Sequence, residues 1–416
     1  MKDTYKTVKL GDIAEINSRQ INKDFSFKNI RYIDIASVTK GSIDNIQDLQ
    51  TSKAPSRAKR LVKKNDILYS TVRPNLEHYT FIKNDLPNNT VASTGFAVIT
   101  PNQDLVNPYY LYCLITQSQF TQYLSQVAEQ AVSTYPTVSP NVIADLELSL
   151  PPLSEQKRIA NILSSFDNKI EQLKKENKIL EDIAENIFKE WFVKYNFPNK
   201  DRKPYKDSGG KMIDSELGPI PKGWRVGKLG EICELKSGFA FKGEDFVKNS
   251  STEVVKIKDI LGQGQIDTSN LSYVSNSVIE QNSKLSKFIL SEGDILIAMS
   301  GNTTGKIGLM PKTEKNIFLN QRVGKIFFKN LAYYSFVYNF LMTNNYEQKI
   351  LNMGYGSAQP NINPEQIAAI RIVLPNTTIL QKYKTFSTYF IKKQLHNLRL
   401  IALYKHTRNN LLNKLY

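Results

Sequence analysis

Apolar residues recur at alternating steps of four and three in the middle of the chain, which is the spacing of a coiled-coil seam. The stretch runs from Glu155 to about Phe192 without glycine or proline. It is flanked by Pro151, Pro152 and Pro198, and proline is poorly tolerated inside a helix. The seam positions are Ile159, Leu163, Phe166, Ile170, Leu173, Asn177, Leu180, Ala184, Ile187 and Trp191. Nine of the ten are apolar, so we predict a long helix that packs against a partner helix, and an ordinary amphipathic helix that packs on its own domain is the alternative.

A second, rougher seam lies at the end of the chain, from about Ile379 to Leu415. Its apolar members are Ile391, Leu395, Leu398, Ala402 and Leu412, and Lys405 and Asn409 interrupt it. Residues 155–192 carry eight acidic and seven basic side chains, whereas the last 41 residues carry eight basic and no acidic ones. Opposite charge favours pairing between the two helices, so we predict an antiparallel coiled coil within one chain. Asn177, the polar member of the first seam, is expected to fix its register.

The chain repeats itself with a period near 224 residues. The segment Ser133–Pro151 recurs as Ser357–Pro375, with serine, prolines and aliphatic residues at matching positions. The segment Lys9–Glu15 recurs with a similar sequence as Lys228–Glu234. Such agreement indicates two copies of one structural plan.

Each copy begins with about 150 residues of globular character. Short strand-like runs such as Ile67–Tyr69 and Phe96–Ile99 lie between Asn, Gly and Pro residues. Helices are predicted from Pro108 to about Gln126 and from Ala332 to about Ile350. We therefore predict an α/β fold of the α+β type, with a mixed sheet in each of two globular domains. The predicted boundaries are 1–150 and 218–375 for the globular domains, 151–197 and 376–416 for the long helices, and 198–217 for a polar linker.

The charge of the chain points to a polyanionic partner. Lys and Arg number 55 and Asp and Glu 39, which gives a formal net charge of +16. Nucleic acid is favoured over a membrane surface because no cationic stretch is strongly amphipathic with bulky anchors. A basic protein that is merely kept soluble by its lysines is the alternative.

Several classes of protein are excluded. Cys113 and Cys233 are too few and too distant in sequence for a disulfide scaffold or a Cys-based zinc site. The three histidines (His78, His396 and His406) are too scattered for a metal cluster, so we expect no metal. No apolar run approaches the length of a membrane span, and the first residues lack a signal-peptide core, so a cytoplasmic protein is expected.

Two short motifs with catalytic associations are degraded. The segment Asn107–Tyr110 (Asn-Pro-Tyr-Tyr) lacks the second proline of the amine-binding loop of amino-methyltransferases, and a helix entry explains it better. The segment Gly301–Lys306 has its glycines one residue too close for a phosphate-binding P-loop, and Ile307 replaces the magnesium-binding Ser or Thr. We therefore expect no cofactor and no catalytic residue.

Four motifs resemble the specificity subunits of type I restriction-modification enzymes. They are Leu150–Ala160 (Leu-Pro-Pro-Leu-Ser-Glu-Gln-Lys-Arg-Ile-Ala), Leu217–Trp224 (Leu-Gly-Pro-Ile-Pro-Lys-Gly-Trp), Ser237–Lys242 and Gly356–Ile362. The first is similar to the start of a spacer helix of that family, and the others to parts of its target recognition domains. Pro375–Gln381 departs from the spacer pattern, which leaves the partner contacts of the second helix less defined.

The resemblance implies a non-catalytic subunit with two target recognition domains, each reading one half of a split sequence in double-stranded DNA. It also implies that two methyltransferase subunits dock on the spacer helices, and that motor and nuclease subunits complete the enzyme. A bifunctional DNA adenine methyltransferase, or its recognition half, is the main alternative. A tethering protein that uses its coiled coil is a third.

Candidate DNA contacts follow from charge and from the repeat. The densest basic run of the first domain predicts contacts at Lys53, Arg57, Lys59, Arg60 and Arg73, with Lys63 and Lys64 in the same run. If part of the run is helical, Arg57, Arg60 and Lys64 share a face. In the second domain the candidates are Lys242, Asn302, Thr303, Thr304 and Lys306. The segment Gly301–Lys306 is better explained as a loop that faces DNA, and a bare structural turn is the alternative. Tyr135 and its repeat partner Gln359 are further candidates. A solvated charged face is the alternative for the basic run.

Overall fold

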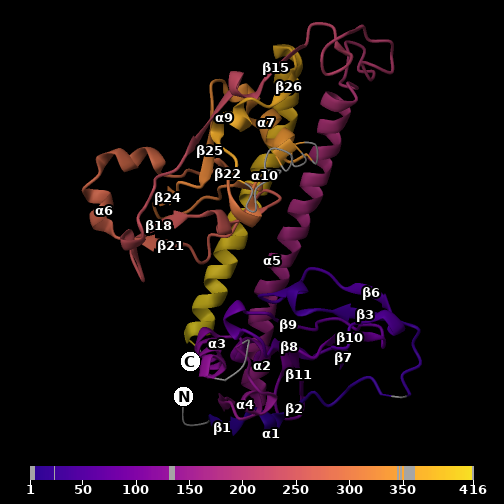
Figure 1. The fold of residues 1–416 in the computed structure, drawn as a ribbon, viewed down its shortest axis with the longest axis vertical. Helices are drawn as coiled ribbons and strands as arrows, with labels where there is room; N and C mark the ends of the chain where they lie inside the picture. Colours follow the sequence, from indigo (N-terminus) through magenta and orange to yellow (C-terminus); the bar gives the residue numbers. More distant parts are fainter. Residues whose placement is uncertain are drawn as a thin grey trace. The chain divides into compact units, whose positions relative to one another are not determined.

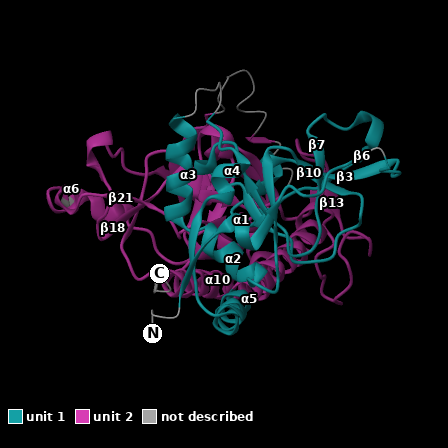
Figure 2. Ribbon diagram, turned by 90° about the horizontal axis from the view of Figure 1, so that it is seen from below, with its two compact units in different colours: residues 1–166, 416 teal, residues 167–415 magenta. Residues whose placement is uncertain are grey.

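The computed structural model describes residues 5–22, 24–130, 136–343, 346, 349–350 and 361–414. The chain divides into two compact units, one within residues 1–166 (unit 1) and one within residues 167–415 (unit 2), shown in Figure 2. Each unit is described by itself. Within the described residues, no helix combines the length and the apolar character needed to cross a membrane.

Unit 1 is built on two four-stranded sheets, whose strand orders are β6-β3-β10-β7 and β2-β11-β8-β9. Strands β3 and β10 are parallel, and the other neighbours in the two sheets are antiparallel. Short pairs β1–β12 and β4–β5 complete the unit. The strands are β1 (Lys6–Lys9), β2 (Ala14–Ile16), β3 (Asn29–Ile33), β4 (Val38–Thr39), β5 (Ser42–Ile43), β6 (Gln47–Gln50), β7 (Ala58–Leu61), β8 (Ile67–Ser70), β9 (Tyr79–Phe81), β10 (Thr90–Ser93), β11 (Phe96–Pro101) and β12 (Glu147–Leu150).

Both sheets of unit 1 contribute side chains to one buried core. Its members are Ile33, Val38, Val62, Leu68, Ile82, Ala92, Phe96 and Val98. The helices are α1 (Leu10–Ile13), α2 (Pro108–Ile115), α3 (Ser118–Gln130), α4 (Pro140–Ala144) and the long α5 (Leu153–Phe188), which continues into unit 2. Asn107 caps α2 by accepting a hydrogen bond from the Tyr110 N–H, as expected for a helix entry.

Unit 2 repeats this plan. Its four-stranded sheets have the orders β16-β25-β22-β23 and β17-β21-β18-β24, and β18 and β24 are parallel. The strands are β13 (Met212–Ile213), β14 (Ile220–Pro221), β15 (Arg225–Lys228), β16 (Cys233–Ser237), β17 (Phe246–Val247), β18 (Thr252–Val255), β19 (Ile260–Gly262), β20 (Gln265–Ile266), β21 (Ser272–Val274), β22 (Ile295–Ala298), β23 (Ile307–Leu309), β24 (Ile317–Leu319), β25 (Val323–Phe328) and β26 (Arg371–Leu374). The helices are α6 (Asn276–Glu280), α7 (Tyr334–Leu341), α9 (Pro364–Ala368) and α10 (Thr377–Lys414).

The sheets of the two units match except for one edge strand in each, β7 and β17, and this agreement confirms the predicted repeat. Sheet β2-β11-β8-β9 corresponds to β16-β25-β22-β23, and β6-β3-β10 corresponds to β21-β18-β24. The strand that ends at Leu150 in unit 1 and its counterpart that ends at Leu374 in unit 2 pair in the same way. Lys6 lies opposite Leu150 in unit 1, and Arg225 lies opposite Leu374 in unit 2.

The long helices α5 and α10 form the predicted antiparallel pair, visible in magenta and yellow in Figure 1. Asp167 near the middle of α5 lies 2.9 Å from Arg408 near the end of α10. Further along α5, Glu176 lies 3.2 Å from Lys393. Since the α10 numbers fall as the α5 numbers rise, the helices run in opposite directions. Both contacts join an acid of α5 to a base of α10, as their net charges lead one to expect.

Two local predictions are wrong. The stretch predicted as one helix from Pro108 to about Gln126 forms α2 and α3, because the polar run Thr116–Ser118 breaks it and the Thr116 hydroxyl bonds the Tyr112 carbonyl. Helix α7 covers only part of the predicted 332–350 helix. It ends at Leu341, and just beyond it the Thr343 hydroxyl bonds the carbonyl of Phe340.

The basic run of unit 1 does not form the helix that a shared face would require. Residues 58–61 form the edge strand β7, because Leu61 and Arg60 pair with β10. Arg57, Arg60 and Lys64 therefore do not share a helix face.

The segment predicted as a polar linker is folded. The Tyr205 ring stacks on Phe197 at 4.6 Å, and Phe197 stacks on Trp224 at 5.0 Å. The Tyr205 hydroxyl also donates a hydrogen bond to the Lys211 carbonyl. These contacts anchor the segment after α5 to the core of unit 2, to which Phe197 and Trp224 belong.

Candidate nucleic-acid interface

Two loops occupy equivalent places in the two units. One joins β8 to β9 (residues 71–78) and the other joins β22 to β23 (residues 299–306), and each contains a turn of 3₁₀ helix. Arg73 and Glu77 of the first loop have positive φ values of 47° and 55°. Gly301 and Gly305 of the second loop have φ values of 74° and 83°. The left-handed conformation costs a residue with a side chain about 1–2 kcal/mol, whereas glycine adopts it readily.

Each loop is fastened to the segment that precedes the last short helix of its unit. Val72 pairs with Thr137, and the Arg73 N–H donates to the Pro136 carbonyl at 2.9 Å. In unit 2, Ser300 pairs in the same way with Asn361. In the sequence, the predicted contact residues Tyr135 and Gln359 come shortly before the paired residues Thr137 and Asn361. Tyr135 and Gln359 themselves lie outside the described part of the chain.

The loop of unit 2 presents two of its predicted residues to solvent. Asn302 and Lys306 are exposed. The hydroxyls of Thr303 and Thr304 donate instead to the backbone carbonyls of Ile257 and Gly301, at 3.0 and 2.7 Å. The threonines therefore shape the loop, whereas the side chains of the asparagine and the lysine are exposed to solvent.

The predicted cations of unit 1 are spread over different elements. Lys53 ends a 3₁₀ turn and is exposed, and Lys59 is exposed on β7. The Arg57 guanidinium lies 3.4 Å from the Asp34 carboxylate, in an ion pair that leaves more than half of the arginine side chain exposed. Arg60 is half-buried on β7, and burial lowers the pKa of its guanidinium. Arg73, on the loop described above, is exposed.

Lys242 of unit 2 begins a 3₁₀ turn and is exposed. Its ammonium lies 3.4 Å from the Glu244 carboxylate, and its backbone N–H donates to Asp245 at 2.7 Å. An exposed ion pair of this kind is weak, so it leaves the lysine available to a phosphate. The neighbouring Lys256, which the sequence did not single out, lies 3.4 Å above the Phe246 ring.

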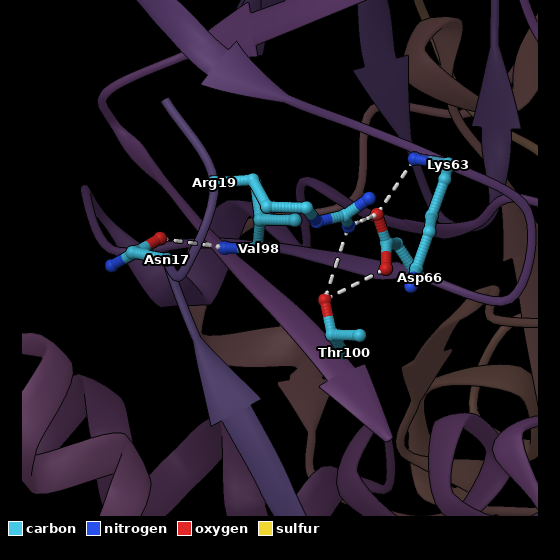
Figure 3. Close-up of polar contacts among 6 residues, drawn as sticks. All are labelled: Asn17, Arg19, Lys63, Asp66, Val98 and Thr100. Carbon is cyan, nitrogen blue, oxygen red and sulfur yellow. Dashed lines mark hydrogen bonds and ion pairs between the residues drawn. The ribbon is translucent and has the colours of Figure 1, made fainter. Parts of the chain in front are cut away.

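One basic residue of unit 1 has a structural role instead. Arg19 lies 2.5 Å from Asp66, which is completely buried, and Thr100 donates to the same carboxylate at 2.8 Å (Figure 3). The Lys63 backbone N–H donates to it at 2.7 Å. Burial raises the pKa of Asp66, and the Lys63 N–H and the Arg19 charge oppose this rise. Asp294 has the corresponding place in unit 2, where it pairs with Lys325.

The first long seam is buried as the periodicity predicts. Ile159, Leu163, Ile170, Leu173 and Asn177 are buried, and Phe166, Leu180 and Ile187 are half-buried. Within unit 2, Ile170 and Leu173 pack with Ile401 of α10.

The seam of α10 is shifted from the predicted one. Ile391 is buried, but Leu395 and Leu398 are half-buried against the core of unit 2. The buried positions that follow Ile391 are Gln394, Asn397, Ile401 and Leu412, and of these only Leu412 belongs to the predicted seam. A step of three after Ile391, in place of the predicted step of four, leads to Gln394 and then to Asn397.

The helix pair also carries apolar side chains on its outer surface. Ile179 and Ile183 of α5 are 58% and 40% exposed. On α10, Tyr389 is 67% exposed, and its ring and that of Phe386 both contact Phe390. Exposed apolar side chains that form a contiguous patch are typical of a protein–protein interface, and Phe386, Tyr389 and Phe390 form such a ring cluster on α10.

Within the described residues, no cluster of three or more His, Cys, Asp or Glu side chains is placed to hold a metal ion. Cys113 and Cys233 are buried and unpaired with each other. Burial raises the pKa of the Cys233 thiol to about 12, so this residue is a poor nucleophile.

Comparisons with a family model, with curated proteins and with solved structures all point to the same family. The family described as type I restriction modification DNA specificity domain matches this chain twice, over residues 2–182 and 221–403. The specificity subunit of the type I restriction enzyme HindI from Haemophilus influenzae is 27% identical, across 94% of this chain and 94% of its own. That of MjaVIII from Methanocaldococcus jannaschii is 30% identical, across 69% of this chain and 64% of its own.

The crystal structure of a type I restriction-modification S subunit from M. genitalium aligns with 99% of this chain and 96% of its own. The TM-score is 0.50 at 16% identity, which shows a shared fold.

Proposed function

Because this chain belongs to the family of type I restriction-modification DNA specificity subunits, we propose that it reads a bipartite target in double-stranded DNA. Each globular half reads one half-site, unit 1 through residues 1–150 and unit 2 through residues 218–375. The observation that carries this proposal is the duplicated loop, because β8–β9 and β22–β23 present different side chains on the same backbone shape.

Affinity comes from the basic surplus and specificity from the loops. Lysine and arginine contacts to phosphates give sequence-independent, salt-sensitive binding, and contacts to base edges select the sequence. Lys306, Lys242, Arg57 and Lys59 are exposed and suit phosphates. Asn302 and Arg73 lie on the matching loops and suit base edges.

The helix pair serves as a spacer and as a dock for two methyltransferase subunits. The exposed apolar residues Ile179, Ile183 and Tyr389 supply a surface that the seam does not use. Methyl transfer to adenine and DNA cleavage belong to the partner methyltransferase and motor–nuclease subunits. This chain recognises the DNA sequence, and it does so in the cytoplasm.

An exchange of domains tests this proposal. Residues 1–150 are replaced by the corresponding domain of a relative with a different target, and the chimera is co-expressed with the methyltransferase subunit. Sequencing of modified bases in cellular DNA should show one half-site changed and the other unchanged. A change in both half-sites would contradict independent reading by the two domains.

A further inference from the structure

The turn that joins β24 to β25 (residues 320–322) lies beside the candidate loop of unit 2. The backbone N–H of Met299, at the start of that loop, donates a hydrogen bond to the Arg322 carbonyl at 3.0 Å. The backbone N–H of Ile362 donates to the Met299 carbonyl at 2.9 Å. Three segments that are distant in the sequence therefore meet at the start of the loop: the loop itself, the turn before β25 and the segment before α9.

Each of these three segments presents a polar side chain to solvent. The residues are Asn302, Arg322 and Asn361, and all three are exposed. Nη1 of the Arg322 guanidinium donates a hydrogen bond to Oδ1 of Asn361 at 3.4 Å. A hydrogen bond between two exposed side chains adds little to the stability of the fold, but it restrains the arginine before a ligand binds. A guanidinium carries five N–H donors, so one bond to Asn361 is compatible with two further bonds to a ligand.

Unit 1 has a glycine, Gly95, at the place of Arg322. The Gly95 carbonyl accepts a hydrogen bond from the Thr71 N–H at 2.8 Å, as the Arg322 carbonyl does from the loop of unit 2. The next residue begins a strand in each unit, β11 or β25. A Cβ atom added to Gly95 would lie 2.3 Å from Cδ1 of Ile35, so a side chain there would displace Ile35. The same turn therefore carries a long cationic side chain in unit 2 and none in unit 1, as expected of a position at which two domains read different sequences.

We propose that Arg322 reads a guanine in the half-site of unit 2, donating two hydrogen bonds to its O6 and N7 atoms in the major groove, with Asn361 as its positioning residue. This deepens the proposed function and rests on it. The planar guanidinium matches these two acceptors, and no other base offers the same pair. Unit 1 has Gly95 at the corresponding place, so it reads its own half-site without an arginine from this turn.

The test uses the full chain in complex with its methyltransferase subunits. Modified-base sequencing gives the target, and the half-site that is unchanged by the exchange of residues 1–150 belongs to unit 2. In a duplex probe, each guanine of that half-site is replaced in turn by 7-deazaguanine, which lacks the N7 acceptor. One replacement should weaken binding by wild type by about 5-fold or more, and it should have no effect on binding by Arg322→Ala. On the unmodified probe, Arg322→Ala should bind about 5- to 150-fold less tightly than wild type, the range expected for loss of a bidentate contact.

Further variants separate base reading from other roles. Arg322→Lys keeps the charge but loses the planar fork, so it should bind less tightly than wild type, whereas a phosphate would accept either cation. Asn361→Ala should lower the ratio of affinities for guanine and 7-deazaguanine and keep the unfolding midpoint within about 2 °C, because the residue is exposed. Arg371→Ala is the matched control. Arg371 is an exposed arginine of the same unit that pairs with Glu216, and its loss should alter neither target nor affinity.

The inference is overturned if Arg322→Ala binds the unmodified probe as well as wild type does, if the half-site of unit 2 contains no guanine, or if no 7-deazaguanine weakens binding by wild type. If Arg322→Ala folds poorly, the 7-deazaguanine series with wild type and Arg322→Lys still decides. Failure of the proposed function looks different. In that case wild type itself selects no bipartite sequence, whatever residue stands at position 322.

Discussion

The side-chain amide of Asn397 donates a hydrogen bond to the amide oxygen of Asn177 across the antiparallel helix pair, at 2.9 Å. Both residues are buried, and the amide oxygen of Asn397 has no hydrogen-bond partner among the described residues. A paired polar contact inside an apolar seam favours one register over the others, because slipping the helices would leave two amides buried and unpaired.

This pair predicts opposite effects for single and double substitutions. Asn177→Leu leaves Asn397 buried without its partner and should lower the free energy of unfolding by about 1–3 kcal/mol. Asn177→Leu combined with Asn397→Leu should recover this loss or exceed it, because it fills the seam with apolar groups. Denaturant unfolding of the two variants measures the difference. Equal destabilisation by both would mean that the two amides are not coupled.

Leu173 and Ile179 separate the stability of the helix pair from its docking role. Leu173 is buried in the seam, so Leu173→Ala should cost about 2–5 kcal/mol of unfolding free energy. Ile179 is largely exposed, so Ile179→Ala should change stability by less than about 0.5 kcal/mol. It should nevertheless weaken association with the methyltransferase subunit, measured by titration of the purified subunits. Unchanged association would remove Ile179 from the docking surface.

Glu181 makes the stability of unit 2 depend on pH. Burial raises the pKa of its carboxyl group from 4.5 to about 8, and the Asp182 charge adds to this rise while Lys178 opposes it. Between pH 4.5 and 8 the unfolded chain releases the proton while the folded chain keeps it, so stability falls as the pH rises through this window.

Glu181→Gln mimics the protonated carboxyl and should flatten this part of the profile. At pH 8 the variant should be more stable than wild type by an amount on the order of a few kcal/mol, and near pH 4.5 the two should agree. Thermal or denaturant unfolding across this range measures the difference. A constant difference between the two proteins at every pH would show that Glu181 does not titrate in the window.

The salt dependence of DNA binding distinguishes contact residues from structural cations. Lys306→Ala and Arg57→Ala should each reduce the slope of log affinity against log salt by about one unit. Arg19→Ala should leave the slope unchanged and lower stability instead, because it strands the buried Asp66 carboxylate. If Lys306→Ala and Arg57→Ala kept the wild-type slope, the solvated-face interpretation of these cations would be restored.

The long helices could be predicted from sequence because their signal is local and sustained over many turns. The register of α10 could not, because Gln394 and Asn397 are polar and a search for apolar periodicity passes over them. Their burial depends on a partner 220 positions away. The secondary structure of the basic run that contains Arg60 could not be predicted either. Strand β7 forms because it pairs with β10, and no property of the run itself requires a strand.

The candidate site was predictable in outline only. The degraded P-loop motif Gly301–Lys306 leads to the loop of Lys306, and the structure shows that Thr303 and Thr304 mainly shape that loop. The left-handed conformation of Arg73 could not be predicted, because arginine is not a residue that favours turns. Gly301, at the corresponding position of unit 2, does favour this conformation, but only the matched backbone shows that the two positions correspond.

Sequencing of modified bases in DNA from cells that contain this chain and its methyltransferase subunit tests whether the chain reads a bipartite target. We predict one methylated motif made of two defined half-sites separated by a spacer of fixed length and free sequence. Deletion of the chain should abolish that motif. A continuous motif without a spacer, or a motif that persists after the deletion, would contradict the claim that this chain reads a bipartite target.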